Sequence, residues 1–149
     1  QNQSKFSRVN PGISTSVFDS RQKSWAGQAT FAMVQTLVRN LLSNAIAYSP
    51  SGAMVRLASR RDGGATVLSV EDGGPGIAAA DRARVFERFV RLDRPGQPAG
   101  VGLGLSIVRS VADDHRASVE LCESPLGGLA VRVSFPPGAG PGGNPAPAP

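Results

Sequence analysis

The most regular hydrophobic pattern in the chain lies between Phe31 and Tyr48. Apolar residues recur there every three or four positions, which is the period of a helix with one buried face. The Ser49-Pro50-Ser51-Gly52 segment ends the pattern, because proline disfavours helix before itself and glycine favours a turn. The spacing therefore predicts an amphipathic helix over residues 31–48. Its apolar positions are Val34, Leu37, Val38, Leu41, Leu42, Ala45 and Ile46.

Alternation of polar and apolar residues replaces the helical period after Gly52. Two alternating runs flank Arg61-Asp62-Gly63-Gly64, a segment typical of a hairpin turn. Two more flank Gly127-Gly128, and a weaker run lies near the start of the chain. The predicted strands are Thr15–Phe18, Ala53–Ser59, Ala65–Asp72, Ala117–Glu123 and Gly128–Phe135.

Two further helices are predicted in the second half of the chain, over Ala79–Phe86 and Leu105–Asp113. The elements then follow the order helix, hairpin, helix, loop, helix, hairpin. Such an order predicts an α/β (α+β) two-layer sandwich, in which a mixed, mostly antiparallel sheet of about five strands carries about three helices on one face.

The 149 residues are enough for one domain with a single main core. We expect a weakly patterned N-terminal segment over 1–28, a folded domain over 29–136 and a disordered tail rich in Pro, Gly and Ala over 137–149. No apolar stretch reaches the roughly 18–20 residues of a membrane span, and the N-terminus lacks a signal-peptide pattern.

The net charge of +5 comes almost wholly from arginine, since Lys5 and Lys23 are the only lysines. The arginines are scattered and have no aromatic residues between them, so we expect no nucleic-acid partner. The single cysteine, Cys122, lies in a strand pattern without a recognisable base nearby. We interpret it as a small core residue rather than a nucleophile, which fits a reducing, cytosolic compartment.

Two asparagines, Asn40 and Asn44, stand four residues apart in the first predicted helix and so share one face, with Tyr48 a further turn along. Asparagine is a mediocre helix former. The pair can be a solvent-facing feature of no further consequence. Alternatively, the neutral amide oxygens can serve Mg²⁺, which keeps several waters and shares phosphate oxygens.

Two glycine-bearing segments follow. Glu71-Asp72-Gly73-Gly74-Pro75-Gly76-Ile77 leaves a strand directly; it can be a simple turn, or it can present a fixed carboxylate to an exocyclic amine such as that of adenine. Gly100–Ser106 lacks the pattern of a dinucleotide fingerprint. It does lead exposed backbone N–H groups into a helix N-terminus, which suits phosphate. Between them, Phe86–Gly96 carries Arg88, Arg91 and Arg94 and has the composition of a mobile lid.

In this order and at these spacings, the segments resemble those of the GHKL, or Bergerat-fold, ATPases, and among them the bacterial sensor histidine kinases. "NLLSNAIAYS" is similar to the N box, "DGGPGI" to the G1 box and "FERFVR" to the F box. "GVGLGLSIV" is similar to the G2 box and "GGLAVRVSFP" to the final glycine box. The resemblance covers about residues 31–136.

The resemblance implies an ATP and Mg²⁺ site. It makes Asn44 the Mg²⁺ ligand and Asn40 its catalytic neighbour, which organises the metal and the phosphates. It makes Asp72 the partner of the adenine amino group. The other ATP-binding residues that it implies are Tyr48 beside the base, Gly74, Gly76 and Ile77 in the adenine floor, Phe86, Arg88, Phe89 and Arg91 in the F box and lid, and Gly100, Val101, Gly102, Leu103, Gly104, Leu105 and Ser106 around the phosphates.

The activity that the resemblance implies is transfer of the ATP γ-phosphoryl group to a histidine on a separate dimerisation domain, and from there to a response regulator. Hydrolytic relatives such as gyrase and MutL carry a glutamate at position 40 to activate water. A neutral Asn40 cannot act as that base, which favours phosphotransfer over hydrolysis. We expect this fragment to lie in the cytoplasm without membrane contact of its own, as part of a membrane-anchored sensor.

Two positions depart from the usual pattern of the family. Ala47 stands where many of these kinases carry Lys or Arg, and Leu129 stands where a threonine commonly supports adenine binding. We expect these changes to weaken nucleotide binding by roughly 1–2 kcal/mol unless the lid arginines compensate.

The single histidine, His115, lacks the sequence context of a phosphoacceptor, and we interpret it as structural. The acceptor is then expected outside this sequence. Two other functions stay open: a degenerate module that senses nucleotide and acts through protein partners, and a serine kinase of the anti-sigma type with the same fold.

Overall fold

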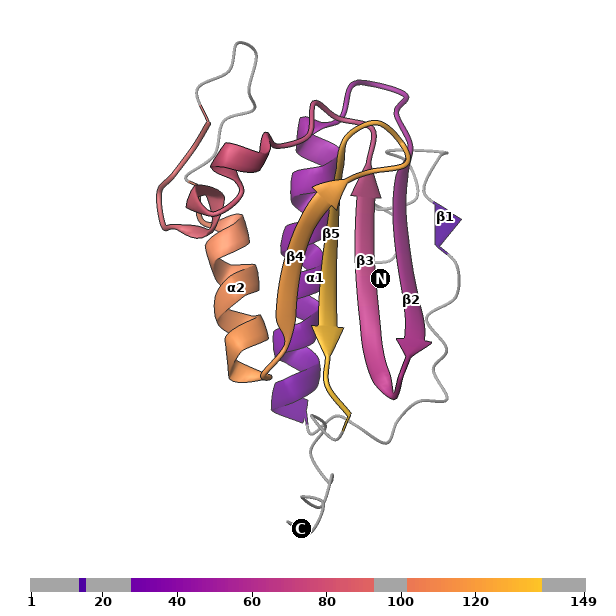
Figure 1. Cartoon of the computed structure of the whole chain (residues 1–149), viewed down its shortest axis with the longest axis vertical. Helices are drawn as coiled ribbons and strands as arrows, with labels where there is room; N and C mark the ends of the chain where they lie inside the picture. The colour runs from indigo at the N-terminus through magenta and orange to yellow at the C-terminus, as the bar shows by residue number, and fades with distance from the viewer. Residues whose placement is uncertain (1–13, 16–27, 93–101, 138–149) are drawn as a thin grey trace, which may run out of the picture.

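The structure, a computed structural model, describes residues 14–15, 28–92 and 102–137. In this part of the chain, one sheet carries two α-helices on one of its faces (Figure 1). The elements in chain order are β1 (Ser14–Thr15), α1 (Gln28–Tyr48), β2 (Val55–Asp62), β3 (Ala65–Asp72), the 3₁₀ turns η1 (Ala79–Asp81) and η2 (Arg84–Phe86), α2 (Gly104–Asp114), β4 (Ser118–Glu123) and β5 (Leu129–Phe135).

The strands form a five-stranded sheet in the order β1-β2-β3-β5-β4. The short β1 pairs parallel with β2, and every other pairing is antiparallel. The predicted two-layer sandwich with a mixed, mostly antiparallel sheet is therefore confirmed. The strand expected over Thr15–Phe18 is described only at Ser14–Thr15, and its remaining positions lie outside the described residues.

Helix α1 supplies one side of the core through the apolar face that its sequence predicts. Val34, Leu37, Leu41 and Ala45 are buried, with between 0% and 7% of their surface exposed. They pack against sheet residues on the facing side, including Val70 and other members of the core cluster. Burying such side chains stabilises the fold by about 1.5–3 kcal/mol each.

The β2–β3 hairpin is tighter than its predicted four-residue turn. Asp62 and Ala65 still pair as strand residues, so the loop is Gly63-Gly64 alone. Both glycines have positive φ, +54° and +85°, the left-handed pair that a two-residue hairpin of this twist requires.

The helix predicted over Ala79–Phe86 is wrong. The segment forms the two 3₁₀ turns η1 and η2, so the described chain has two α-helices instead of about three. Neither Ala78 nor Ala83, which precede the turns, makes a side-chain cap. An uncapped segment of this length gains too little from propagation to offset the cost of starting a helix.

The expectation that Cys122 is a core residue is also wrong. Leu121, the neighbouring residue of β4, points into the core, so strand alternation turns Cys122 to the other face of the sheet. The thiol is half-buried there and lies 3.7 Å from the Ala130 carbonyl oxygen.

His115 follows α2 and has the structural role expected of it. It is buried, its Nδ1 lies 2.7 Å from the Val111 carbonyl oxygen, and its ring meets Phe135 edge-on at 6.1 Å between centroids. Arg116 then takes a left-handed conformation with φ +53°, and its N–H donates to the Asp113 carbonyl. A non-glycine residue is strained at such a helix end.

Different loops and element ends lie at the two ends of the molecule (Figure 1). At the upper end of the view lie the end of α1, the end of β3, the two 3₁₀ turns, the start of α2 and the β4–β5 turn. At the lower end α1 begins and the β2–β3 turn lies. Pro137 lies there too, since a methyl group built on Gly64 would be 3.3 Å from its Cγ.

Replacing Arg116 by glycine should raise the free energy of unfolding by about 0.5–1 kcal/mol, because glycine takes the left-handed conformation without strain. Urea denaturation measures the change. The matched control, Asp114→Gly, places glycine within the right-handed last turn of α2 and should lower stability. Equal losses in both variants would contradict this interpretation of Arg116.

Candidate nucleotide site

The site is organised around the carboxylate of Asp72 at the end of β3. This side chain is buried, with the whole residue only 6% exposed. Its Oδ1 accepts hydrogen bonds from the N–H of Gly74 at 2.8 Å and the N–H of Leu129 at 3.0 Å. The other oxygen, Oδ2, takes no part in these two bonds.

Gly128 completes this arrangement through its lack of a side chain. Its N–H donates to the Asp72 carbonyl oxygen at 3.1 Å. A methyl group built on Gly128 would overlap both Asp72 Oδ1 and the Gly74 nitrogen. The second glycine of the Gly127-Gly128 pair is therefore needed for space beside the carboxylate.

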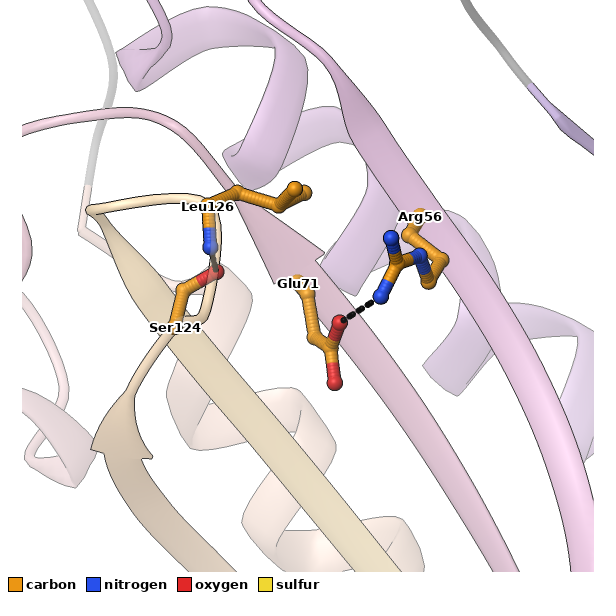
Figure 2. Close-up of polar contacts among 4 residues, drawn as sticks. All are labelled: Arg56, Glu71, Ser124 and Leu126. Atoms are coloured by element: carbon orange, nitrogen blue, oxygen red, sulfur yellow. Dashed lines mark hydrogen bonds and ion pairs between the residues drawn. The ribbon is translucent and has the colours of Figure 1, made fainter.

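The β4–β5 turn holds Gly128 and Leu129 in this position. Ser124 accepts the Leu126 N–H on its Oγ at 3.0 Å, and the Ser124 N–H donates to the Gly128 carbonyl. Figure 2 shows the Ser124 contact beside Glu71, which pairs with Arg56 at 3.2 Å. Glu71 precedes Asp72 in β3, so the two acids point to opposite faces of the sheet.

The loop after Asp72 lies against the end of α1 and the β4–β5 turn. A methyl group on Gly74 would be 2.7 Å from the Tyr48 carbonyl oxygen, and one on Gly76 would be 3.3 Å from the Gly128 carbonyl oxygen. Gly76 also has φ +68°. Ile77 packs against the core cluster. These contacts leave little room for a side chain at Gly74 or Gly76.

Asn40 and Asn44 lie on α1, and both are half-buried. Asn40 donates from its Nδ2 to the Thr36 carbonyl at 2.9 Å, so its Oδ1 is left as an acceptor. Asn44 lies against the start of α2, because a methyl group on Gly104 would be 3.0 Å from its Oδ1 and 3.1 Å from its Nδ2. The second of the two predicted asparagines therefore lies against the glycine segment.

Helix α2 begins without a side-chain cap. Its N-cap residue is Leu103, which makes no capping hydrogen bond, and the Ser106 hydroxyl donates to the Leu103 carbonyl at 2.8 Å instead. The first N–H groups of an α-helix have no partner within the helix, and they carry partial positive charge. This helix start suits an anionic group.

The F-box segment crosses the start of the glycine segment. Phe89 has φ +65°, donates its N–H to the Gly102 carbonyl at 3.0 Å and leaves 72% of its surface exposed. Phe86 instead packs on the core, and the Arg109 guanidinium lies 5.4 Å from its ring centroid. Arg88 and Arg91 are exposed. The rest of the predicted lid, with Gly100 and Val101, lies outside the described residues.

Known proteins share this arrangement. The family model of the "Histidine kinase-, DNA gyrase B-, and HSP90-like ATPase" matches residues 31–139. The mycobacterial sensor histidine kinase MprB superposes with a TM-score of 0.62 at 34% identity, over 70% of this chain and 70% of that one. The chain belongs to this ATPase family, in its sensor histidine kinase group.

Two other relatives add detail within this family. The sensor-like histidine kinase SenX3 of Mycolicibacterium smegmatis is 45% identical over 106 residues, which are 70% of this chain and 28% of SenX3. Full-length ShkA in complex with AMPPNP superposes with a TM-score of 0.56 at 32% identity, over 70% of this chain and 21% of ShkA. The chain therefore spans little more than a quarter of the length of the SenX3 relatives.

The described residues fit the ATP and Mg²⁺ that the family implies. Asp72 offers a carboxylate oxygen, Asn40 and Asn44 offer amide oxygens, and α2 offers an uncapped start. Within residues 28–92 and 102–137, no group of three or more His, Cys, Asp or Glu side chains is placed to hold a metal. A magnesium ion here would thus share its ligands between an amide oxygen, phosphate oxygens and water.

Sequence reasoning missed three residues that hold the Asp72 carboxylate or the loop that follows it. Leu129 was noted for its lack of a hydroxyl, yet its backbone N–H bonds Asp72 whatever its side chain is. Gly128 was predicted as the first residue of a strand, whereas its contacts show that Asp72 and Gly74 need the space that an absent side chain leaves. Arg82 donates to the Ile77 and Leu121 carbonyls, and no local pattern marks it.

Replacing Gly128 by alanine should lower ATP affinity by about tenfold or more, because the added methyl group pushes the Asp72 carboxylate out of place. Calorimetric titration with Mg-ATP, at a temperature where the variant is folded, measures the change. Gly127→Ala is the matched control: its methyl group meets nothing within 4 Å, although φ is +98°. It should lower stability and leave affinity unchanged. Unaltered ATP binding by Gly128→Ala would contradict the spatial role.

Proposed function

We propose that this domain binds Mg-ATP and transfers the γ-phosphoryl group to a histidine of a separate dimerisation domain, which then passes it to an aspartate of a response regulator. The observation that carries the proposal is the Asp72 carboxylate, held by two backbone N–H groups at the same end of the molecule as Asn44 and the start of α2. The relatives named above are sensor histidine kinases, and ShkA is described in complex with AMPPNP, an ATP analogue.

In this proposal the base and the phosphates of ATP contact different groups of residues. Asp72 Oδ2 accepts a hydrogen bond from the adenine amino group, while Gly74, Gly76 and Ile77 form the floor beneath the base. Tyr48, 38% exposed at the end of α1, lines its edge. The phosphates lie on the backbone of residues 100–106 below Arg88 and Arg91, which supply positive charge.

Asn44 is the proposed ligand of the Mg²⁺ ion, with Asn40 beside it. When bound, the ion neutralises phosphate charge and orients the oxygens for in-line transfer. The asparagines are neutral, so they add no repulsion toward the polyphosphate. The proposed role of the chain is to position the nucleotide while offering no general base that could activate water.

The transfer itself needs no base from this chain. A neutral imidazole already carries a lone pair on one nitrogen, so that nitrogen forms the new bond to the γ-phosphorus while the bond to the β–γ bridging oxygen breaks. ADP leaves, and the histidine later releases its ring proton. Water, by contrast, must lose a proton to attack, and Asn40 cannot accept one.

We further propose that the domain works in the cytoplasm, where ATP is available, as part of a longer membrane-anchored sensor. Among the described residues, no helix is both long and apolar enough to cross a membrane. The domain boundaries that we propose, 29–136 with flanking segments 1–28 and 137–149, are those of the sequence analysis.

One observation favours a second candidate, a nucleotide-binding module without kinase activity. Ala47 is exposed on α1 close to Asn44 in sequence, where many relatives carry a cation. If phosphate binding is too weak for transfer, the domain senses ATP or ADP and acts through protein contacts. The phosphotransfer experiment below separates the two functions.

Replacing Asp72 by asparagine should lower Mg-ATP affinity by about 10–100-fold, because an amide nitrogen at the Oδ2 position donates where the adenine amino group also donates. The amide oxygen can still accept from Gly74 and Leu129, so the fold should persist. Glu71→Gln is the matched control, since it makes the same charge change on the other face of β3. An Asp72→Asn variant that is folded and binds ATP as the wild type does would overturn the adenine assignment.

Incubating the full-length protein, with its own acceptor segment, and γ-labelled ATP should place acid-labile, base-stable label on a histidine other than His115. Asn44→Ala should abolish most of this label, since it removes the proposed metal ligand. The isolated 149-residue chain, whose buried His115 is its only histidine, should bind ATP and take up no label. ATP binding by the full-length protein without any histidine label would favour the sensing module.

A further inference from the structure

Arg82 connects the loop after Asp72 to the edge of the sheet. Its Nε donates to the Ile77 carbonyl oxygen at 3.1 Å, and its Nη1 donates to the Leu121 carbonyl oxygen at 3.2 Å. Leu121 belongs to β4, the last strand in the sheet order, whereas Ile77 ends the loop that forms the proposed adenine floor. In the sequence, Arg82 stands between η1 and η2.

The guanidinium of Arg82 can hold the Ile77 and Leu121 carbonyls at a fixed distance from each other. A guanidinium is planar, and its donors form a rigid fork, so two bonds to two carbonyls set both a distance and an orientation between them. In the part of the chain that the structure describes, the salt bridges involve Arg56, Arg60, Arg84 and Arg109. Arg82 is half-buried and uses its charge on backbone carbonyls instead. Such charge-assisted bonds are stronger than neutral ones.

The loop is held at three places, of which Arg82 provides the last. Its beginning is held where the Gly74 N–H donates to Asp72 Oδ1, and its middle where Gly76 packs closely on Gly128. Its end is held where the Ile77 carbonyl accepts from Arg82. Without this last contact, the Ile77 side chain would still pack on the core. The Ile77 backbone, however, would lose the bond that fixes it relative to the sheet.

We propose that Arg82 is a positioning residue that sets the adenine floor at its working distance from Asp72, and so contributes to recognition of the base. This inference rests on the proposed nucleotide function. In this proposal Arg82 acts through the loop, since both of its described bonds go to protein carbonyls. Its effect should therefore fall on base discrimination, since Asp72 can accept from the amino group of adenine only while the ring lies at the right height.

A merely structural bridge would behave differently. It would lower the stability of the folded chain and weaken the binding of every nucleotide alike. A positioning role predicts a larger loss for adenine than for hypoxanthine, which has a carbonyl in place of the amino group. The ratio of ADP to inosine diphosphate affinity is therefore the decisive measurement, alongside the unfolding free energy.

The experiment compares Arg82→Met, which keeps length and removes every donor, with Arg82→Lys, which can reach one carbonyl. Arg84→Met is the matched control: Arg84 lies two residues away, with its side chain 61% exposed and 3.6 Å from Asp81. Calorimetric titrations of the chain with Mg-ADP and with Mg-inosine diphosphate are run where circular dichroism shows each variant folded.

Arg82→Met should weaken ADP binding about tenfold and inosine diphosphate binding about twofold or less, so that the affinity ratio narrows. The affinity ratio of Arg82→Lys should lie between those of Arg82→Met and the wild type. The affinity ratio of Arg84→Met should match that of the wild type. If Arg82→Met does not fold, a folded Arg82→Lys with a narrowed ratio supports the inference, and one with the wild-type ratio overturns it.

Equal losses for both nucleotides in Arg82→Met, or no loss, would also overturn the positioning role. A wild-type chain that binds neither nucleotide would overturn the proposed function and this inference together. A wild-type chain that binds ADP, with an Arg82→Met variant that binds it equally well, would overturn only the inference.

Discussion

The structure depends most on one carboxylate oxygen, Oδ1 of Asp72, which receives two backbone N–H groups from two different parts of the chain. These bonds join the end of β3 to the following loop and to the start of β5. A buried carboxylate is costly unless its hydrogen bonds are satisfied, and here the fold satisfies one oxygen. The same contacts that stabilise the fold therefore fix the orientation of the carboxylate and leave Oδ2 out of both bonds.

The remaining polar groups of the site divide by charge. The fixed negative charge lies at the proposed base end, whereas Asn40, Asn44 and the start of α2 bring neutral amides and partial positive charge to the proposed phosphate end. A carboxylate among the phosphates would repel them or need a metal to compensate. Because Asn40 and Asn44 are neutral amides, they do not repel the phosphates, and they offer no group that could accept a proton from water.

Much of the fold could be predicted from the sequence, because α1 and the β2–β3 hairpin carry clear periods and their own end signals. The helix predicted over residues 79–86 was wrong, since apolar spacing alone cannot tell two short turns from a short helix. In the site, the motif residues Asn44, Asp72 and Gly104 do gather at one end. Arg82 could not be found, because its bond to Leu121 spans 39 residues. Gly128 was predicted only as the first residue of a strand, because the space that it leaves appears only once β5 lies beside β3.

The direction of α1 has a consequence for how the domain is connected. The described chain enters α1 at the end far from Asp72, and after β5 it leaves at Pro137 beside the Gly63-Gly64 turn, at that same far end (Figure 1). Strand β1 lies at the opposite end, because Ser14 pairs with Arg56 and Arg56 pairs with Glu71, the neighbour of Asp72. The part of the chain that precedes α1 is thus fastened to the sheet at the Asp72 end, whereas the part that follows β5 departs from the far end.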